Sequence, residues 1–481
     1  HAGKGTVQAS VPVGAVEQLA QRSDVQRVAA APMARTNAGA LTSQGYISHR
    51  ANSVVTGGYD GSGVRVGVLS DSVDALPALI ASGDLPADTV VLPGQSGNPG
   101  SSEGSAMMEI VHDLAPGAKL FYATAFNGPT SFADNIRMLR DVYHCDIIVD
   151  DITYFDEGVF QDDEIAVAVN QVVANGAIYF SSAGNSGNLT SGTSGTWEGD
   201  FAAGSASAAP LPAGYTLHRF GGVQDYNVLT GSTIYISTKW SDPLGNSSND
   251  YDMFLLNAAG TTVLCASTDT QTGAGSTPEE ACYREAGWPA NSRIVIAKKA
   301  SAQPRALHLD TQRGALSIGT AGATFGHNAG ASTTTLAATY WNSARTGTRP
   351  FTGGAANPTE TFSSDGPRKI FFNADGTAVT PGNYLFASNG GVTLAKPDFS
   401  AADGVSTKTP GFLPFFGTSA AAPHAAAIAA LIKSARPDYT RAQILEALRQ
   451  TALDIRGAGV DRDAGYGLMM AQQAVTYALT H

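Results

Sequence analysis

Residues 63–72 read Gly63-Val64-Arg65-Val66-Gly67-Val68-Leu69-Ser70-Asp71-Ser72 and follow a glycine-rich turn at residues 58–62. A short, almost continuous apolar run of this kind is typical of a strand buried on both faces, as in a parallel sheet. The run ends in polar residues, and polar side chains at the carboxyl end of a parallel strand are candidates for a functional site. This stretch therefore predicts a fold class and indicates where chemistry takes place.

The alternation of strand and helix continues further along the chain. Apolar runs and amphipathic segments follow one another at Leu120–Ala125, Ser131–Tyr143, Asp146–Asp150, Asp163–Ala174 and Ala177–Ser181. Strands that alternate with helices are typical of an α/β domain whose mostly parallel sheet is flanked by helices.

Between about residues 200 and 319 the pattern changes to short alternating segments separated by Gly, Asn, Pro and Ser. This pattern predicts an antiparallel β-sandwich, inserted in the α/β domain and joined to it at surface connections, so we expect it to be separable from catalysis. A small N-terminal α+β segment is also indicated, with a helix at Val13–Gln21 between strands at Val7–Val11 and Val25–Ala31. The predicted segments are residues 1–35, 36–199, 200–319 and 320–481.

The composition excludes some classes of function. The 481 residues are 43% hydrophobic, and 29 Lys and Arg face 41 Asp and Glu, a net charge of −12. Such a charge disfavours a nucleic-acid partner or an anionic membrane surface. No apolar run is long enough to predict a membrane-spanning helix. Of three cysteines, Cys265 and Cys282 are close enough to predict a disulfide, while Cys145 precedes an apolar run and is expected to be a buried thiol.

The most specific segment is Gly417-Thr418-Ser419-Ala420-Ala421-Ala422-Pro423-His424, which leads into a helix of small residues. A serine at a helix N-terminus lies at the positive end of the dipole, beside backbone N–H groups able to bind an oxyanion. A serine in this position can also be a helix cap without any chemistry.

This segment resembles the nucleophile motif Gly-Thr-Ser-x-Ala-x-Pro of the subtilisin-like serine peptidases. Further matches occur in the family's order, at Val66–Asp71, Ala115–Ala118, Ser181–Asn185, Phe362–Pro367 and Lys396–Ala401. The resemblance implies the subtilisin-like fold, with Ser419 as the nucleophile, Asp71 as the catalytic aspartate and Asn185 in the oxyanion hole. It also implies a secreted endopeptidase that acts on proteins or peptides through an acyl-enzyme and requires no cofactor.

One position departs from the family. Where the family has His-Gly-Thr-His, this chain has Glu103-Gly104-Ser105-Ala106, and His112, nine positions later, would face the other side of the helix. The related sedolisins use a Ser-Glu-Asp triad on the same fold, with the aspartate four positions after the glutamate. Here that position is Met107. The acid partner must come from elsewhere. Asp71 is the first choice, and Asp150 or Asp151 is the second.

A carboxylate can replace histidine only if it holds a proton at the working pH. Free Glu titrates about two units below free His, but a second carboxyl group nearby would force the pair to share a proton. The sequence thus predicts a peptidase that favours acidic pH. A subtilase-like pseudopeptidase, catalytically silent, that binds peptides or a partner stays the alternative.

The same resemblance implies a substrate groove between residues 123–130 and 151–155. It also makes residues 1–35 the end of a propeptide, a possible inhibitor of its own enzyme, or else a retained structural subdomain. Calcium is possible at Asp250-Tyr251-Asp252 or at residues 461–465, which offer the oxygen ligands that this ion takes, although both can also be solvated turns. We assign no metal ligands.

Overall fold

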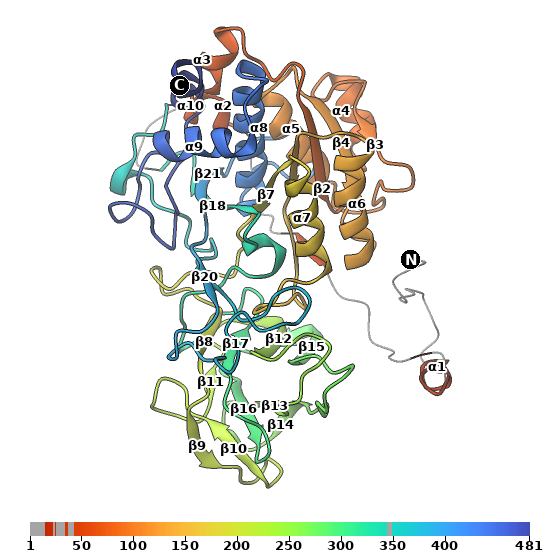
Figure 1. The fold of residues 1–481 in the computed structure, drawn as a ribbon, viewed down its shortest axis with the longest axis vertical. Helices are drawn as coiled ribbons and strands as arrows, with labels where there is room; N and C mark the ends of the chain where they lie inside the picture. The colour runs from red at the N-terminus through yellow and green to blue at the C-terminus, as the bar shows by residue number, and fades with distance from the viewer. Residues whose placement is uncertain (1–14, 23–24, 26–33, 37–42, 344–348) are drawn as a thin grey trace.

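The computed structural model describes residues 15–22, 25, 34–36, 43–343 and 349–481. A sheet flanked by helices occupies one end of the long axis, and smaller antiparallel sheets occupy the other (Figure 1). The predicted fold class, a mostly parallel α/β sheet with an antiparallel β-sandwich, is confirmed.

The main sheet has seven strands, all paired in parallel. In spatial order they are β21 (Phe399–Asp403), β18 (Thr334–Tyr340), β7 (Ile178–Ser182), β5 (Ile147–Asp150), β2 (Arg65–Ser70), β4 (Lys119–Thr124) and β3 (Val90–Val91). The stretch that opened the sequence analysis is central strand β2. Because the strands are parallel, all their carboxyl ends lie at one edge of the sheet.

Helices cover both faces of this sheet because successive side chains of each strand point to opposite faces. Val66 and Val68 of β2 belong to the core that contains α5 (Glu103–Leu114) and α8 (Thr418–Ala435). Leu69 belongs to the opposite core, with α6 (Pro129–Asp141) and α7 (Glu164–Ala174). Cys145 is buried in that second core, as predicted.

Further helices complete the α/β part. They are α2 (Gly45–Ser48), α3 (Ala51–Thr56), α4 (Leu76–Ser82), α9 (Arg441–Thr451) and α10 (Ala471–Thr480). None of the helices in the described ranges combines the length and the apolar character needed to cross a membrane.

Two antiparallel sheets form the sandwich. One contains β14 (Val263–Ser267), β13 (Tyr251–Leu256), β16 (Arg293–Lys299), β10 (Tyr215–His218) and β9 (Ala203–Ala206), with β11 (Asn227–Val228) beside β16. The other contains β15 (Glu279–Trp288), β12 (Thr233–Trp240), β17 (Ala306–Asp310) and β8 (Thr196–Asp200). The antiparallel strands begin at Thr196, slightly before residue 200, and the four-segment division itself remains a prediction.

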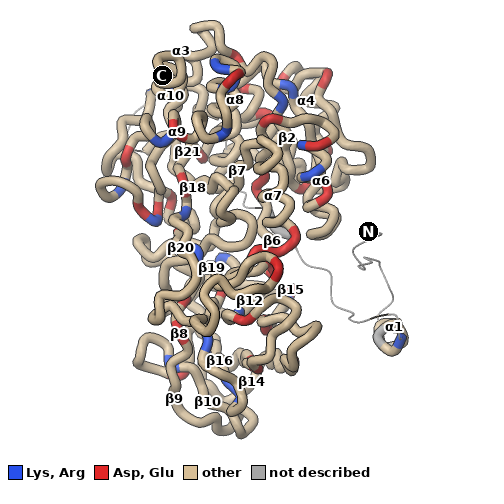
Figure 2. Tube along the Cα trace, viewed as in Figure 1, with Lys and Arg blue, Asp and Glu red and all other residues tan. Residues whose placement is uncertain are grey.

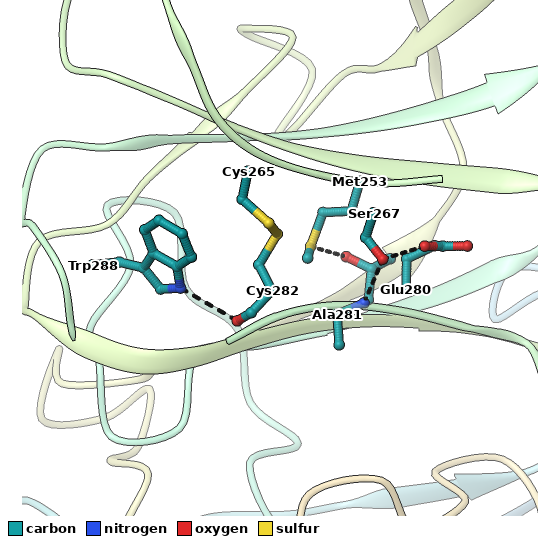
Figure 3. Close-up of a disulfide and its surroundings, with 8 residues drawn as sticks. Met253, Cys265, Ser267, Glu280, Ala281, Cys282 and Trp288 are labelled. Atoms are coloured by element: carbon teal, nitrogen blue, oxygen red, sulfur yellow. Dashed lines mark hydrogen bonds between the residues drawn. A yellow bond between two sulfur atoms is a disulfide. The ribbon is translucent and has the colours of Figure 1, made fainter. Parts of the chain in front are cut away.

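The predicted disulfide between Cys265 and Cys282 is present (Figure 3). Cys265 lies on β14 and Cys282 on β15, so the bond joins the two sheets of the sandwich. Trp288 packs in the same core and donates a hydrogen bond of 3.3 Å from its indole Nε1 to the Cys282 carbonyl oxygen.

The sandwich contacts the α/β domain more closely than the sequence predicts. Lys239 of β12 donates hydrogen bonds to the carbonyl oxygens of Phe155 and Glu157, the second at 3.0 Å. An apolar cluster at the same junction includes Phe160 and Phe371. Phe371 directly follows β19 (Arg368–Ile370), which pairs antiparallel with β20 (Val392–Leu394). Acidic residues also gather beside β6 (Ile152–Tyr154) and β12 (Figure 2). The insert therefore has polar and apolar contacts with the α/β domain, and its separability from catalysis stays a prediction.

Part of the N-terminal segment is described. Helix α1 (Val16–Ala20) lies within the predicted helix, while the predicted strand at Val7–Val11 and most of that at Val25–Ala31 lie outside the described residues. Strand β1 (Ala34–Thr36) pairs antiparallel with β6, with Arg35 opposite Thr153. A segment of the chain thus already lies as an added strand along β6.

Candidate active site

Asp71 and Glu103 lie where β2 meets the start of α5. Asp71 follows the last residue of β2, and its Oδ2 accepts hydrogen bonds from the Ser101 N–H and Oγ, at 2.5 and 2.6 Å. Its Oδ1 accepts a bond of 3.4 Å from the N–H of Gly104, in the first turn of α5. A carboxylate is favoured at this end of a helix dipole. Asp71 therefore anchors the segment that carries Glu103, which is itself fully buried.

Asp151 is the carboxyl group that the structure brings to Glu103. It follows the last residue of β5, is fully buried, and its carboxyl is hydrogen-bonded to that of Glu103. Burial raises the pKa of Asp151 to about 7, and the nearby charges of Asp71 and Asp150 act in the same direction, against the hydrogen bond from Glu103. Two carboxyl groups can be hydrogen-bonded only if one of them carries a proton, so the pair is a proton-sharing unit.

Asp150, although adjacent in sequence, belongs to a different network. Its Oδ1 accepts hydrogen bonds from the Ile152 N–H at 3.0 Å and the Ser181 Oγ at 2.9 Å, and lies 3.1 Å from His327 Nε2. The other ring nitrogen of His327 lies 2.7 Å from Glu157 Oε1. Burial alone would lower the pKa of His327, but these two carboxylates raise it to about 10. This buried imidazolium fixes the chain on both sides of β6.

Ser419 and Asn185 come together at the N-terminus of α8. Asn185 Oδ1 accepts hydrogen bonds from the N–H and Oγ1 of Thr418, at 3.1 and 2.9 Å. The Nδ2 of the same side-chain amide therefore points away from Thr418. Gly184 has a φ of +97°, and its N–H donates to Thr418 Oγ1 at 3.2 Å. Ser419 Oγ is buried and has no hydrogen-bond partner among the described residues. A hydroxyl and an amide donor thus lie beside the Ser419 N–H at the N-terminus of α8, the kind of group that stabilises an oxyanion.

The residues predicted to line the groove differ in how far they are exposed. Tyr154 is buried, and its hydroxyl donates a 2.6 Å hydrogen bond to the Ala125 carbonyl oxygen, which ties together the two segments predicted to line the groove. Phe155 is also buried and Phe126 is 41% exposed. His112 is half-buried on α5. Burial lowers its pKa, although the nearby negative charge of Asp84 acts in the opposite direction.

The two candidate calcium segments make other contacts. Lys299 Nζ lies 3.3 Å from Asp250 Oδ2 and 3.7 Å from Asp252 Oδ2, so a cationic side chain already faces both carboxylates. Asp461 Oδ1 accepts the N–H groups of Asp463 and Ala464, as in an ordinary turn. The described part of the chain holds no group of three or more His, Cys, Asp or Glu arranged for a metal ion. Calcium binding stays a prediction without assigned ligands.

Sequence reasoning missed two positioning residues. Asp403, the last residue of β21, accepts a 3.0 Å hydrogen bond from the N–H of Gly417, directly before the Thr418-Ser419 pair. The sequence signal for Asp403 is the same as that for Asp71, namely a polar residue at the end of a buried strand. His327 had no such signal, because its two partners come from distant parts of the chain.

A buried serine at a helix N-terminus, with an amide donor beside it, is a feature of serine peptidases that have an α/β fold. The model of the subtilase family matches residues 94–467, and the chain therefore belongs to that family.

Two named proteases are similar to this chain. A stretch of 60 residues is 43% identical to the minor extracellular protease Epr of Bacillus subtilis (strain 168), and covers 12% of this chain and 9% of that protein. The structure of the Clostridium perfringens CspB protease is 13% identical with a TM-score of 0.53, covering 90% of this chain and 99% of that one. At this identity the second likeness shows a shared fold. Membership of the subtilase family supports a serine peptidase.

Proposed function

We propose that this chain is a secreted serine endopeptidase that cleaves peptide bonds through an acyl-enzyme, with Ser419 as nucleophile and Glu103 as general base and then acid. The observation that carries the proposal is the proton-sharing pair of Glu103 and Asp151, at the same sheet edge as the serine and Asn185. Asp151 takes the acid-partner role for which the sequence alone favoured Asp71, and Asp71 holds the start of α5.

In this mechanism Ser419 Oγ attacks the scissile carbonyl carbon, and its proton passes to the Glu103–Asp151 pair. Asn185 Nδ2 and the Ser419 N–H donate to the oxygen that becomes negative. The pair then returns a proton to the departing amine, and the C–N bond breaks to leave the acyl-enzyme. Water, deprotonated by the same pair, hydrolyses the ester and restores the serine.

The pKa of Asp151, raised to about 7, supports a preference for acidic pH, because the pair holds its proton below that value. Secretion is supported by the extracellular relative and by the disulfide, a bond that persists in oxidising compartments.

We also propose that the N-terminal segment inhibits the enzyme, which is supported by the pairing of β1 with β6. A synthetic peptide of residues 25–36 should then inhibit the active enzyme competitively, and an unchanged rate at saturating peptide would contradict it.

The deciding experiment combines peptide hydrolysis, from about pH 3 to pH 9 so as to bracket the carboxyl and histidine ranges, with labelling by a fluorophosphonate. Ser419→Ala should abolish both. Ser237→Ala is the matched control, since Ser237 is also buried and its Oγ has no hydrogen-bond partner among the described residues, but it lies in the insert. A folded native chain that is neither labelled nor active at any pH would instead establish the silent pseudopeptidase.

A further inference from the structure

A small pocket lies between β6 and the segment that carries Asn185. Thr153 and Phe155 line it on the β6 side, and Gly184 and Ser186, the two neighbours of Asn185, line it on the other. The insert contributes Arg313 to the same pocket. The insert sheet with β8, β12 and β17 faces the α/β domain (Figure 1), so a turn after β17 can reach this place.

The position of the pocket indicates which substrate side chain it receives. Pairing of β1 with β6 shows that an extended peptide segment can run along this strand. In the proposed mechanism, the carbonyl held by Asn185 belongs to the residue directly before the scissile bond. That residue's side chain leaves the Cα atom next to this carbonyl. A pocket lined by both neighbours of Asn185 is therefore the pocket for the side chain that precedes the cleaved bond.

Arg313 determines the charge of this pocket. Among the described residues that line it, Arg313 is the only charged one, and the rest are apolar, hydroxyl or amide side chains or glycine. An arginine is protonated at every working pH, and its planar fork matches a carboxylate. The protein as a whole has a net charge of −12, so a cation here is not a consequence of general composition.

The turn that carries Arg313 is attached to the active-site segment. Thr311 Oγ1 donates to the Gly195 carbonyl oxygen at 2.7 Å, and the Gly195 N–H donates to the Ser186 carbonyl oxygen at 2.9 Å. Arg313 itself has a φ of +67°, a left-handed conformation that is uncommon for residues other than glycine. The hydrogen bonds hold this turn against the pocket wall.

We propose that Arg313 makes the enzyme selective for peptides with Glu or Asp directly before the cleaved bond, so that the β-sandwich insert sets specificity. This inference rests on the proposed peptidase function and names the substrate class of its site. The guanidinium would bind the substrate carboxylate by charge-assisted hydrogen bonds, and a neutral side chain of the same size would lose them.

The test compares four fluorogenic peptides that differ only at that position, with Glu, Gln, Ala or Lys, cleaved by the full chain at pH 6. We expect kcat/KM for Glu to exceed that for Gln by at least about tenfold, as for hydrogen bonds to a charged group. In Arg313→Gln this ratio should fall to nearly one. In Arg313→Glu the order should reverse, with Lys above Glu.

Arg284→Gln is the matched control, because Arg284 is an exposed arginine of the same insert that stacks over Trp288 and lies outside the pocket. Its Glu-to-Gln ratio should equal that of the native enzyme. If the native enzyme cleaves the Gln and Ala peptides with the same kcat/KM as the Glu peptide, the role of Arg313 is wrong while the peptidase function stands. A native enzyme that cleaves none of the four and resists fluorophosphonate refutes the peptidase function itself.

Discussion

Asp151→Asn tests which carboxyl group shares a proton with Glu103. Burial raises the pKa of Asp151 to about 7. A group with that pKa is about 90% protonated at pH 6 and about 10% protonated at pH 8, so a rate that needs the proton falls roughly tenfold over that interval. Asparagine does not titrate, so this alkaline limb should disappear. The rate at pH 6 should also drop by about 10², the usual contribution of general acid–base catalysis.

The assay is kcat/KM for one fluorogenic peptide across the pH range, for the native enzyme and three variants. Glu280→Gln is the control, because burial also raises the pKa of Glu280 to about 7, but this carboxyl lies in the insert. It accepts hydrogen bonds from Ser267 (Figure 3) and from Gln271. Its rate and alkaline limb should match those of the native enzyme. If Asp71→Asn loses both features and Asp151→Asn keeps both, the reasoning is wrong and Asp71 is the partner.

Stability gives a second readout of the same carboxyl. The pKa of Asp151 in the folded chain, about 7, lies above its ordinary value of 3.8, so the folded state binds this proton more tightly. The stabilising contribution is complete below pH 3.8 and is lost as the pH rises toward 7. Thermal unfolding of Asp151→Asn should therefore depend less on pH in that interval. Parallel curves for the variant and the native chain would contradict the raised value.

Two further predictions concern structure around the site and in the insert. Gly184→Ala should lower kcat, because the φ of +97° at this position costs alanine about 1–2 kcal/mol and the new Cβ would lie 3.1 Å from Ser364 Oγ. Gly192→Ala is the control, because Gly192 also has a positive φ but a Cβ there would meet no neighbouring atom. This variant should keep the native kcat. Replacing Cys265 and Cys282 by serine should lower the free energy of unfolding by about 3 kcal/mol, as measured by denaturant titration, because the bond closes a loop with a separation of 17 residues. An unchanged denaturation midpoint would refute the second.

The sequence alone was enough to predict the fold class and to name the candidate site residues. The apolar run at residues 65–70, the helix over residues 164–174 and the Gly-Thr-Ser segment before α8 are local patterns, and local patterns follow from backbone geometry and periodicity. The departure at Glu103 was also visible, because one residue in a motif can be compared directly. The disulfide could be predicted because two cysteines lie close together in the insert.

Only the tertiary structure decided how these residues combine. Asp71 and Asp151 both follow strand ends at the same edge of the sheet, and sequence gave no means to tell which carboxyl would meet Glu103. Likewise, the turn that carries Arg313 contains no recognisable motif and lies more than a hundred residues from Asn185. Arg313 lines the pocket only because the sandwich packs against the segment that contains β6. The physical reason is that proton sharing and charge recognition depend on distances and burial. These are set by packing between segments that are remote in the chain.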